Sequence, residues 1–287
     1  MKKILIIFSI LLLSSCSTVS IQNQNPLPKT KEKQEVSKEI SLPGKSLLSN
    51  HLDSDLKLTP GIFVLAPDKK DLEKFYSNEK TPLIFSEHKF VREDKEGIII
   101  SNSKEEFLIE DALVIPFPIE ESFNPGETVL TAYPEAKGFT YAYILKPEDG
   151  KYLVRYMDEN LSGRKDILDS SKLKKLGGDY VKGAIIIVKE GERYLNETLL
   201  CDCNGFVLTI SKNGIINLRN KEHTVPVQFS DEYKSGDDVF LSLNGVYVPG
   251  TVLSQNLGNG SYEVMYKENN TNKEKAFDLT RITKNLD

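Results

Sequence analysis

The sequence predicts a mainly β protein: tandem small barrels in an A-B-A′-B′ duplication that follows a disordered tether. From residue 58 onward, apolar runs of four to eight residues are bounded by Gly, Pro, Asn and Asp, which is typical of short strands. Helical periodicity is weak over the same region. Blocks of residues also recur in the same order in two successive parts of the chain.

The first 16 residues have the order of a secretory signal. Two lysines precede an apolar stretch at 4–13, and two serines and Cys16 follow it. The apolar run is half of the roughly 20 residues that a membrane-spanning helix needs. Residues 13–16, Leu-Ser-Ser-Cys, resemble the lipobox of bacterial lipoproteins. The resemblance implies a signal peptide at 1–15, a palmitate-type lipid on Cys16 and a membrane anchor through that lipid. A plain signal peptide with a coincidental cysteine is the alternative.

Residues 16–57 comprise the lipidated cysteine and a polar segment rich in Gln, Asn, Lys, Ser and Pro. Such a composition does not bury a core, so we expect a flexible linker that holds the folded part off the membrane. Ser17 stands where some bacteria place the Asp that retains lipoproteins at the inner membrane. We therefore expect a lipid-anchored protein of the bacterial cell envelope, delivered to the outer membrane, with the periplasmic or surface face left open.

The folded part begins at residue 58, and its elements are predicted in chain order. A helix is expected over 69–76 and a helical turn over 170–176. Asn-Gly pairs that begin at residues 204, 213, 244 and 259 predict tight type I′ turns. Strands are expected at 62–66, 98–100, 129–132, 141–145, 152–156, 184–188, 206–210, 239–243 and 262–266.

The clearest repeat is Gly-x-Tyr-x-Val-x-Tyr, at 150–156 and 260–266. It predicts a first pair of barrel modules over 58–176 and a second pair over 177–287. Further blocks match in the same order: 126–129 with 236–239, 139–144 with 247–252, and 166–173 with 277–282. The segments that precede each copy match more weakly: 61–66 with 183–188, 97–100 with 214–218, and 114–117 with 225–229.

The second module of each pair, at 126–176 and 236–282, is similar to the Tudor/SH3-like barrel family. In Tudor domains an aromatic cage binds methylated Lys or Arg through cation–π contacts. The resemblance places Tyr133 and Tyr156 at cage positions of the first copy and Tyr266 at one of the second, with non-aromatic residues in the remaining places. It implies the fold, and we do not carry over the ligand.

Five tyrosines are the candidate binding residues: Tyr133, Tyr141, Tyr156, Tyr247 and Tyr266. They are predicted to line an aromatic groove for a peptide or glycan. The alternative is that alternate tyrosines fill the barrels of a chain that has no Trp.

Cofactor and metal sites are not expected, because the three histidines are scattered along the chain. Cys201 and Cys203 are predicted to be half-buried thiols, with a strained or redox-active Cys-x-Cys bond as the alternative.

A net charge of −5 and a pI near 5.5 argue against general nucleic-acid binding. The sequence has no nucleophile elbow, Walker loop or zinc-protease motif. We therefore interpret the chain as a non-enzymatic binding or scaffolding lipoprotein for an unidentified protein, peptide or glycan. A cell-wall or glycan-acting enzyme with a site between modules is the alternative class. A host-matrix adhesin is a further possibility if the protein is surface-exposed, and a purely structural envelope protein is the third interpretation.

Overall fold

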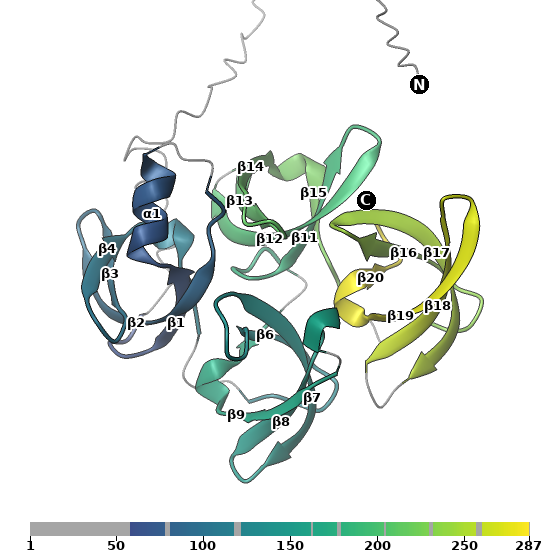
Figure 1. The fold of residues 1–287 in the computed structure, drawn as a ribbon, viewed down its shortest axis with the longest axis horizontal. Helices are drawn as coiled ribbons and strands as arrows, with labels where there is room; N and C mark the ends of the chain where they lie inside the picture. Colours follow the sequence, from purple (N-terminus) through teal and green to yellow (C-terminus); the bar gives the residue numbers. More distant parts are fainter. Residues whose placement is uncertain are drawn as a thin grey trace, which may run out of the picture. The chain divides into compact units, whose positions relative to one another are not determined.

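The computed structural model describes residues 58–77, 81–117, 122–161, 163–176, 179–203, 205–229, 232–256 and 260–286. They form four modules of five strands, which we name A (58–117), B (122–176), A′ (179–229) and B′ (232–286) (Figure 1). The predicted mainly β fold of small tandem modules is confirmed. The predicted signal peptide, Cys16 and the tether over 16–57 lie outside the described residues.

The first two modules differ in one inserted helix. Module A contains β1 (Phe63–Pro67), α1 (Lys69–Tyr76), β2 (Phe85–Asp94), β3 (Gly97–Ser101), β4 (Glu106–Ile109), the 3-10 helix η1 (Asp111–Leu113) and β5 (Ile115–Pro116). Module B contains β6 (Thr128–Ala132), β7 (Phe139–Glu148), β8 (Lys151–Tyr156), η2 (Glu159–Leu161), β9 (Lys165–Leu168), η3 (Ser170–Lys172) and β10 (Lys174–Lys175).

The last two modules have no α-helix among their described residues. Module A′ contains β11 (Ile185–Glu190), β12 (Arg193–Cys203), β13 (Phe206–Ser211), β14 (Ile216–Asn220), η4 (Lys221–His223) and β15 (Thr224–Pro226). Module B′ contains β16 (Asp238–Leu243), β17 (Val246–Asn256), β18 (Ser261–Glu268), β19 (Thr271–Asp278), η5 (Leu279–Arg281) and β20 (Ile282–Thr283).

All four modules share one antiparallel strand order, in which the fifth strand pairs with the first and the first four pair in sequence. Module A has the order β4-β3-β2-β1-β5, and module B has β10-β6-β7-β8-β9. Modules A′ and B′ repeat this pairing, and a single pair between Leu195 and Val246 joins their sheets through β12 and β17. A short 3-10 helix precedes the fifth strand every time.

A glycine with positive φ begins each module and fixes the path of its second strand. Its N–H donates to a second-strand carbonyl at 2.8–2.9 Å, and the next second-strand residue is an extra one, a β-bulge. A bulge bends the strand and increases its twist, so the second strand can pair on both sides. The glycines are Gly61, Gly126, Gly183 and Gly236, and their acceptors are Phe90, Ile144, Leu199 and Val252.

The structure confirms most of the predicted repeat and corrects two blocks. The Tyr-x-Val-x-Tyr motifs lie on β8 and β18 in matching register, with Tyr152 opposite Leu168 and Tyr262 opposite Phe277. The match of 166–173 with 277–282 is therefore two residues out of register at its start. The match of 97–100 with 214–218 is wrong, because the first segment forms β3 whereas the second leads into β14. Short Gly-Ile-Ile segments look alike on third and fourth strands.

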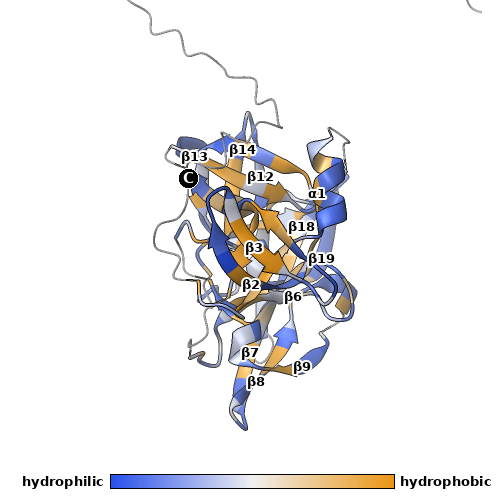
Figure 2. Cartoon of the chain, turned by 90° about the vertical axis from the view of Figure 1, so that its left-hand side faces the viewer, coloured by the Kyte–Doolittle hydropathy of each residue, from blue (hydrophilic) through white to orange (hydrophobic). Residues whose placement is uncertain are grey.

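The predicted helix over 69–76 is confirmed as α1, which connects β1 to β2 of module A. It buries Leu72 and otherwise carries mostly polar side chains. Figure 2 shows α1 mostly in the hydrophilic colour, whereas β3 is coloured hydrophobic. The helical turn predicted over 170–176 is the shorter η3. The predicted Asn-Gly turn between β16 and β17 is also confirmed, with positive φ at Asn244 (51°) and Gly245 (83°).

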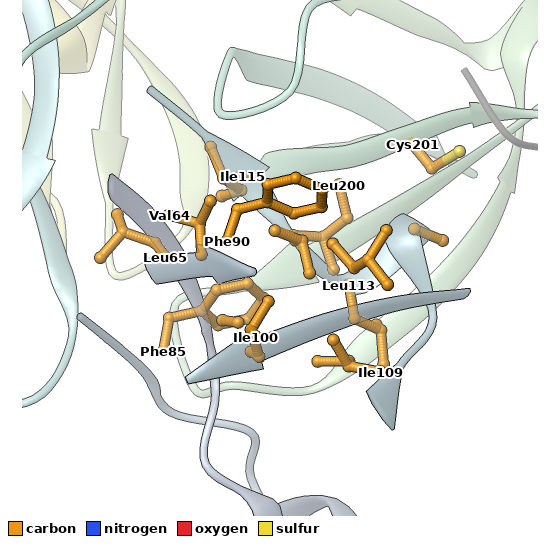
Figure 3. Packing of buried hydrophobic residues seen from close by; sticks show 14 of the residues in the cluster. Val64, Leu65, Phe85, Phe90, Ile100, Ile109, Leu113, Ile115, Leu200 and Cys201 are labelled. Carbon is orange, nitrogen blue, oxygen red and sulfur yellow. The ribbon is translucent and has the colours of Figure 1, made fainter. Parts of the chain in front are cut away.

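Modules A and A′ share the largest hydrophobic core. Val64, Ile100 and Leu113 of module A pack in one cluster with Leu200 and Cys201 of module A′ (Figure 3). Two leucines of module B, Leu130 and Leu176, join the same cluster. Because this core crosses module boundaries, the modules stabilise one another. A single module cut from the chain would expose part of this core, so experiments use the whole chain.

Modules B and B′ meet through a charged pair and a glycine. Arg155 Nη2 lies 2.6 Å from Asp278 Oδ1, and both side chains are less than a fifth exposed. Burial raises the pKa of Asp278, and the Arg155 charge partly offsets that effect. Gly260 lies against the ring of Tyr143, where a Cβ atom would come within 2.7 Å of a ring carbon.

We predict that Gly260→Ala destabilises the protein more than Gly150→Ala does. The two glycines begin equivalent motifs and both have positive φ (61° and 79°), so both substitutions strain the backbone. Only Gly260 is packed, whereas a Cβ at Gly150 meets nothing within 4 Å. Urea unfolding should show an additional loss of about 1–3 kcal/mol for Gly260→Ala. Equal losses would show that the Tyr143 contact does not hold module B′ on module B.

Candidate functional site

The candidate site is a cleft to which all four modules contribute, with a volume of about 460 Å³. Clefts of about 300–1,000 Å³ are typical of ligand sites. We call it the four-module cleft. It is lined by residues 82–85 of module A, 138–141 and 157–158 of module B, 185, 196–198 and 210–214 of module A′, and 242, 244, 245, 280 and 281 of module B′.

Tyr141 on β7 lies at the centre of this junction. Its ring packs against three separate hydrophobic clusters. Its hydroxyl donates to the Gly183 carbonyl at 3.3 Å and lies 3.0 Å from the Thr198 hydroxyl, both in module A′. Burial raises the pKa of Tyr141, and the hydrogen bond with Thr198 partly opposes the rise. The phenol therefore stays protonated and holds module B on module A′.

Tyr247 on β17 likewise connects two modules, A′ and B′, through its hydroxyl and its ring. The Asn196 side-chain amide donates to the Tyr247 hydroxyl at 2.8 Å, and the Asn196 backbone N–H donates to the Gly245 carbonyl at 2.9 Å. The Tyr247 ring packs with Ile185 and Ile187 of module A′. Burial raises the pKa of Tyr247 as well.

Of the five predicted tyrosines, Tyr141 lines the cleft, and the other four, Tyr247 included, do not. Tyr156 is 2% exposed and packs inside module B. Tyr266 is buried in module B′ with its ring centre 5.6 Å from that of Phe277. Tyr133 is half-buried near the Asp158 charge, and burial is the larger cause of its raised pKa. The structure therefore does not bring the five tyrosines together, and their role in binding stays a prediction.

Four charged side chains line the four-module cleft, and the protein itself pairs two of them. Glu197 is 3% exposed, and both its oxygens are satisfied. Arg219 donates to it at 2.6 and 3.2 Å, Asn217 donates at 3.1 Å, and the Thr209 hydroxyl donates a further short hydrogen bond. Glu197 is therefore a structural carboxylate that belongs to the interior of module A′.

Arg281 is the second charge that is already paired. Its Nε and Nη2 donate to the Ser242 carbonyl at 3.1 and 2.9 Å, and its Nη1 contacts the Glu159 carboxylate. The guanidinium also lies 4.8 Å from the centre of the Phe277 ring. Burial lowers the pKa of Arg281, and the negative charge of Asp158 opposes that effect.

Asp158 and Lys212 differ from this pair, because neither forms an ion pair with any residue that the structure describes. The half-buried Asp158 carboxylate accepts a hydrogen bond from the Asn160 backbone N–H at 2.8 Å. Lys212 is exposed in the turn between β13 and β14. The cleft thus presents one carboxylate and one ammonium that form no ion pair within the described part of the chain, although the Asp158 charge also acts on Arg281.

Two exposed isoleucines form an apolar rim beside the cleft. Ile84 of module A lines the cleft and is 46% exposed, and Ile215 of module A′ follows the lining residue Gly214 and is 56% exposed. The Leu83 N–H donates to the Gly214 carbonyl at 2.9 Å, which holds the two segments together. Sequence reasoning missed Ile84, Asp158 and Ile215, because nothing in their spacing indicates that distant modules meet there.

Cys201 and Cys203, predicted to be half-buried, are instead buried in the core shared by modules A and A′. Cys201 is 1% exposed and Cys203 is 8% exposed, and both are thiols. Contact with Cys201, then burial, raises the pKa of Cys203. Within the described ranges, no group of three or more His, Cys, Asp or Glu residues is placed to hold a metal ion. None of the described helices has the length and apolar character needed to cross a membrane.

Comparisons with known proteins identify no family for this chain. No protein-family model matches the sequence, and no curated protein matches it. Among solved structures, it is similar to a crystal structure of the tandem Agenet domain 3-4 of ADCP1, and Agenet domains are Tudor-like. That match has 14% sequence identity and a TM-score of 0.24, and it covers 37% of this chain and 80% of the other. The fold assignment rests on the strand order described above.

We predict that Tyr141→Phe destabilises the protein by about 1–3 kcal/mol, because it leaves buried partners in module A′ without a hydrogen bond. Tyr133→Phe is the matched control, since the Tyr133 hydroxyl makes no hydrogen bond with the described residues, and we expect a change within about 0.5 kcal/mol. Urea unfolding of the full chain measures both. Equal effects would mean that the Tyr141 hydroxyl does not hold the junction.

Proposed function

We propose that this chain is a lipid-anchored protein of the bacterial envelope that binds a protein or peptide segment in the four-module cleft and catalyses no reaction. The observation that carries the proposal is the position of the apolar rim. Ile84 and Ile215 come from different modules, and both remain exposed next to a cleft of ligand size. Exposed apolar side chains gathered at a concave site are typical of recognition surfaces.

The apolar rim favours a peptide over a glycan as the ligand. Isoleucine side chains gain free energy by burial against apolar side chains, at about 25 cal/mol per Å². The cleft also lies where strands and turns of four modules converge, which suits an extended segment that contacts several of them at once. Four modules would then build one composite site, in place of four independent ones.

The anchor is the second part of the proposal, and the sequence at residues 13–16 supports it. Two or more acyl chains at Cys16 would give a stable anchor, because each buried CH₂ contributes about 0.8 kcal/mol. The polar composition of residues 17–57 suits a spacer between that anchor and the folded modules. The ligand would accordingly be a component of the envelope, or of a host if the protein faces outward.

We predict that the double variant Ile84→Ser, Ile215→Ser loses peptide binding by about tenfold or more, since it removes one exposed isoleucine that lines the cleft and one that directly follows a lining residue. Ile167→Ser is the matched control, because Ile167 is a similarly exposed isoleucine (50%) on β9 that neither lines the cleft nor adjoins a lining residue in the chain. Binding of the full chain to a synthetic peptide array, followed by fluorescence anisotropy on the best peptides, measures the effect. Binding that the double variant and the control change equally would contradict the proposed site.

A separate prediction concerns the anchor. The full chain expressed in a diderm bacterium should incorporate labelled palmitate and fractionate with membranes, and Cys16→Ser should lose the label, because the thiol is the acceptor of the lipid. Cys201→Ser is the control and should keep the label. Release of an unlabelled, processed wild-type protein would instead establish a plain signal peptide.

A further inference from the structure

We propose that the four-module cleft selects a peptide segment in which a Lys or Arg side chain neighbours an apolar side chain, with the cation paired to Asp158 and the apolar side chain against Ile84 and Ile215. The inference rests on the proposed function and specifies its ligand. It comes from the charges of the lining residues, and from which of them the protein has already neutralised.

The charge balance of the cleft favours a cationic ligand. Glu197 and Arg281 line the cleft, but both are already paired: Glu197 with Arg219, and Arg281 with Glu159 and the Ser242 carbonyl. Asp158 and Lys212 remain. A ligand must therefore meet a carboxylate, an ammonium, or both.

Of these two charges, Asp158 is placed to contribute more to selectivity. It is half-buried in the cleft, where neighbouring protein atoms exclude part of the surrounding water and electrostatic interactions are stronger than in bulk water. Its charge reaches residues of both modules, because it affects the pKa values of Tyr133, Asp278 and Arg281. Lys212 is exposed on a turn, and solvent-exposed ion pairs contribute little.

The apolar half of the recognition comes from the same cleft. Ile84 lies next to the lining residues Leu83 and Phe85, and Phe139 and Met157 of module B line the cleft as well. Met157 directly precedes Asp158 in the chain, so apolar lining adjoins the carboxylate. A peptide that places a basic and an apolar side chain next to each other matches this adjacency.

The test uses the full chain and an array of acetylated hexapeptides. Their two central positions run through all amino-acid types, and Gly and Ser flank them. We expect the strongest signals from peptides that combine Lys or Arg with Ile, Leu, Val or Phe. For the best peptide, Asp158→Asn should weaken binding by about tenfold, whereas Asp158→Glu should retain most of it. Replacing the basic residue of that peptide by Met should weaken binding to the wild type and leave binding to Asp158→Asn unchanged.

Two control variants separate this effect from general loss of charge or fold. Asp169→Asn removes an exposed carboxylate of the same module that pairs with Lys151, and it should bind as the wild type does. Lys212→Met should change the affinity by no more than about twofold. Circular dichroism and urea unfolding of Asp158→Asn should stay close to the wild type, since the Asn side-chain oxygen can still accept the hydrogen bond from the Asn160 N–H.

The outcomes separate this inference from the proposed function. If peptides bind and respond to Ile84→Ser, Ile215→Ser but ignore the basic residue and Asp158→Asn, the cationic selectivity is wrong and the cleft remains the site. If acidic peptides bind best and Lys212→Met abolishes their binding, the assignment of charge is reversed and the inference fails. If no peptide on the array responds to the isoleucine variants, the proposed function fails with it.

Discussion

The packing of Tyr141 is the interaction on which the arrangement of the modules depends. One side chain of module B contacts three hydrophobic clusters, and its hydroxyl reaches the backbone and a side chain of module A′. Every module contributes residues to at least one of these clusters. The cleft lies at the same junction, since Tyr141 and Thr198 both line it. The contact that holds the modules together therefore also determines which residues face the candidate ligand.

The four modules differ at one position of their second strand. This position on the second strand of each module faces the first-strand residue that lies three places after the opening glycine. A small residue fills this position in modules B and B′, namely Ala142 and Gly250. A polar residue fills it in modules A and A′, namely His88 and Glu197. Both polar residues are buried and held by partners within their own modules: His88 Nδ1 lies 3.0 Å from the Ser86 carbonyl, and Glu197 is held by Arg219. In module A′ the buried Glu197 lies opposite Ile186 of an apolar cluster, and Leu208 and Ile210 are buried in the core shared with module A.

The sequence predicted the repeated local structure well and the site poorly, for one physical reason. Strands with alternating or continuous apolar residues, helix α1 and the glycine openings follow from local chemistry, so they could be read from the chain. Strand β19 could not, because six of its eight residues are exposed and lack an apolar pattern. Ile84 and Asp158, which line the cleft, and Ile215, which follows the lining residue Gly214, lie on three modules, and their proximity depends on packing between modules. The predicted tyrosines include Tyr141 and Tyr247, whose hydroxyls join modules, which a motif within one module does not reveal.

The residues that line the cleft come from different parts of each module. If the four modules did not pack against one another, each would expose equivalent residues to a ligand. Instead module A contributes the segment before β2, module A′ the turn after β13, module B the ends of β7 and β8, and module B′ the turn between β16 and β17 and part of η5. Duplication supplied four similar scaffolds, and their packing against one another left different loops uncovered at the junction. Under the proposed function, selectivity would come from side chains of several modules together, and a single carboxylate such as Asp158 would then contribute more than a repeated tyrosine.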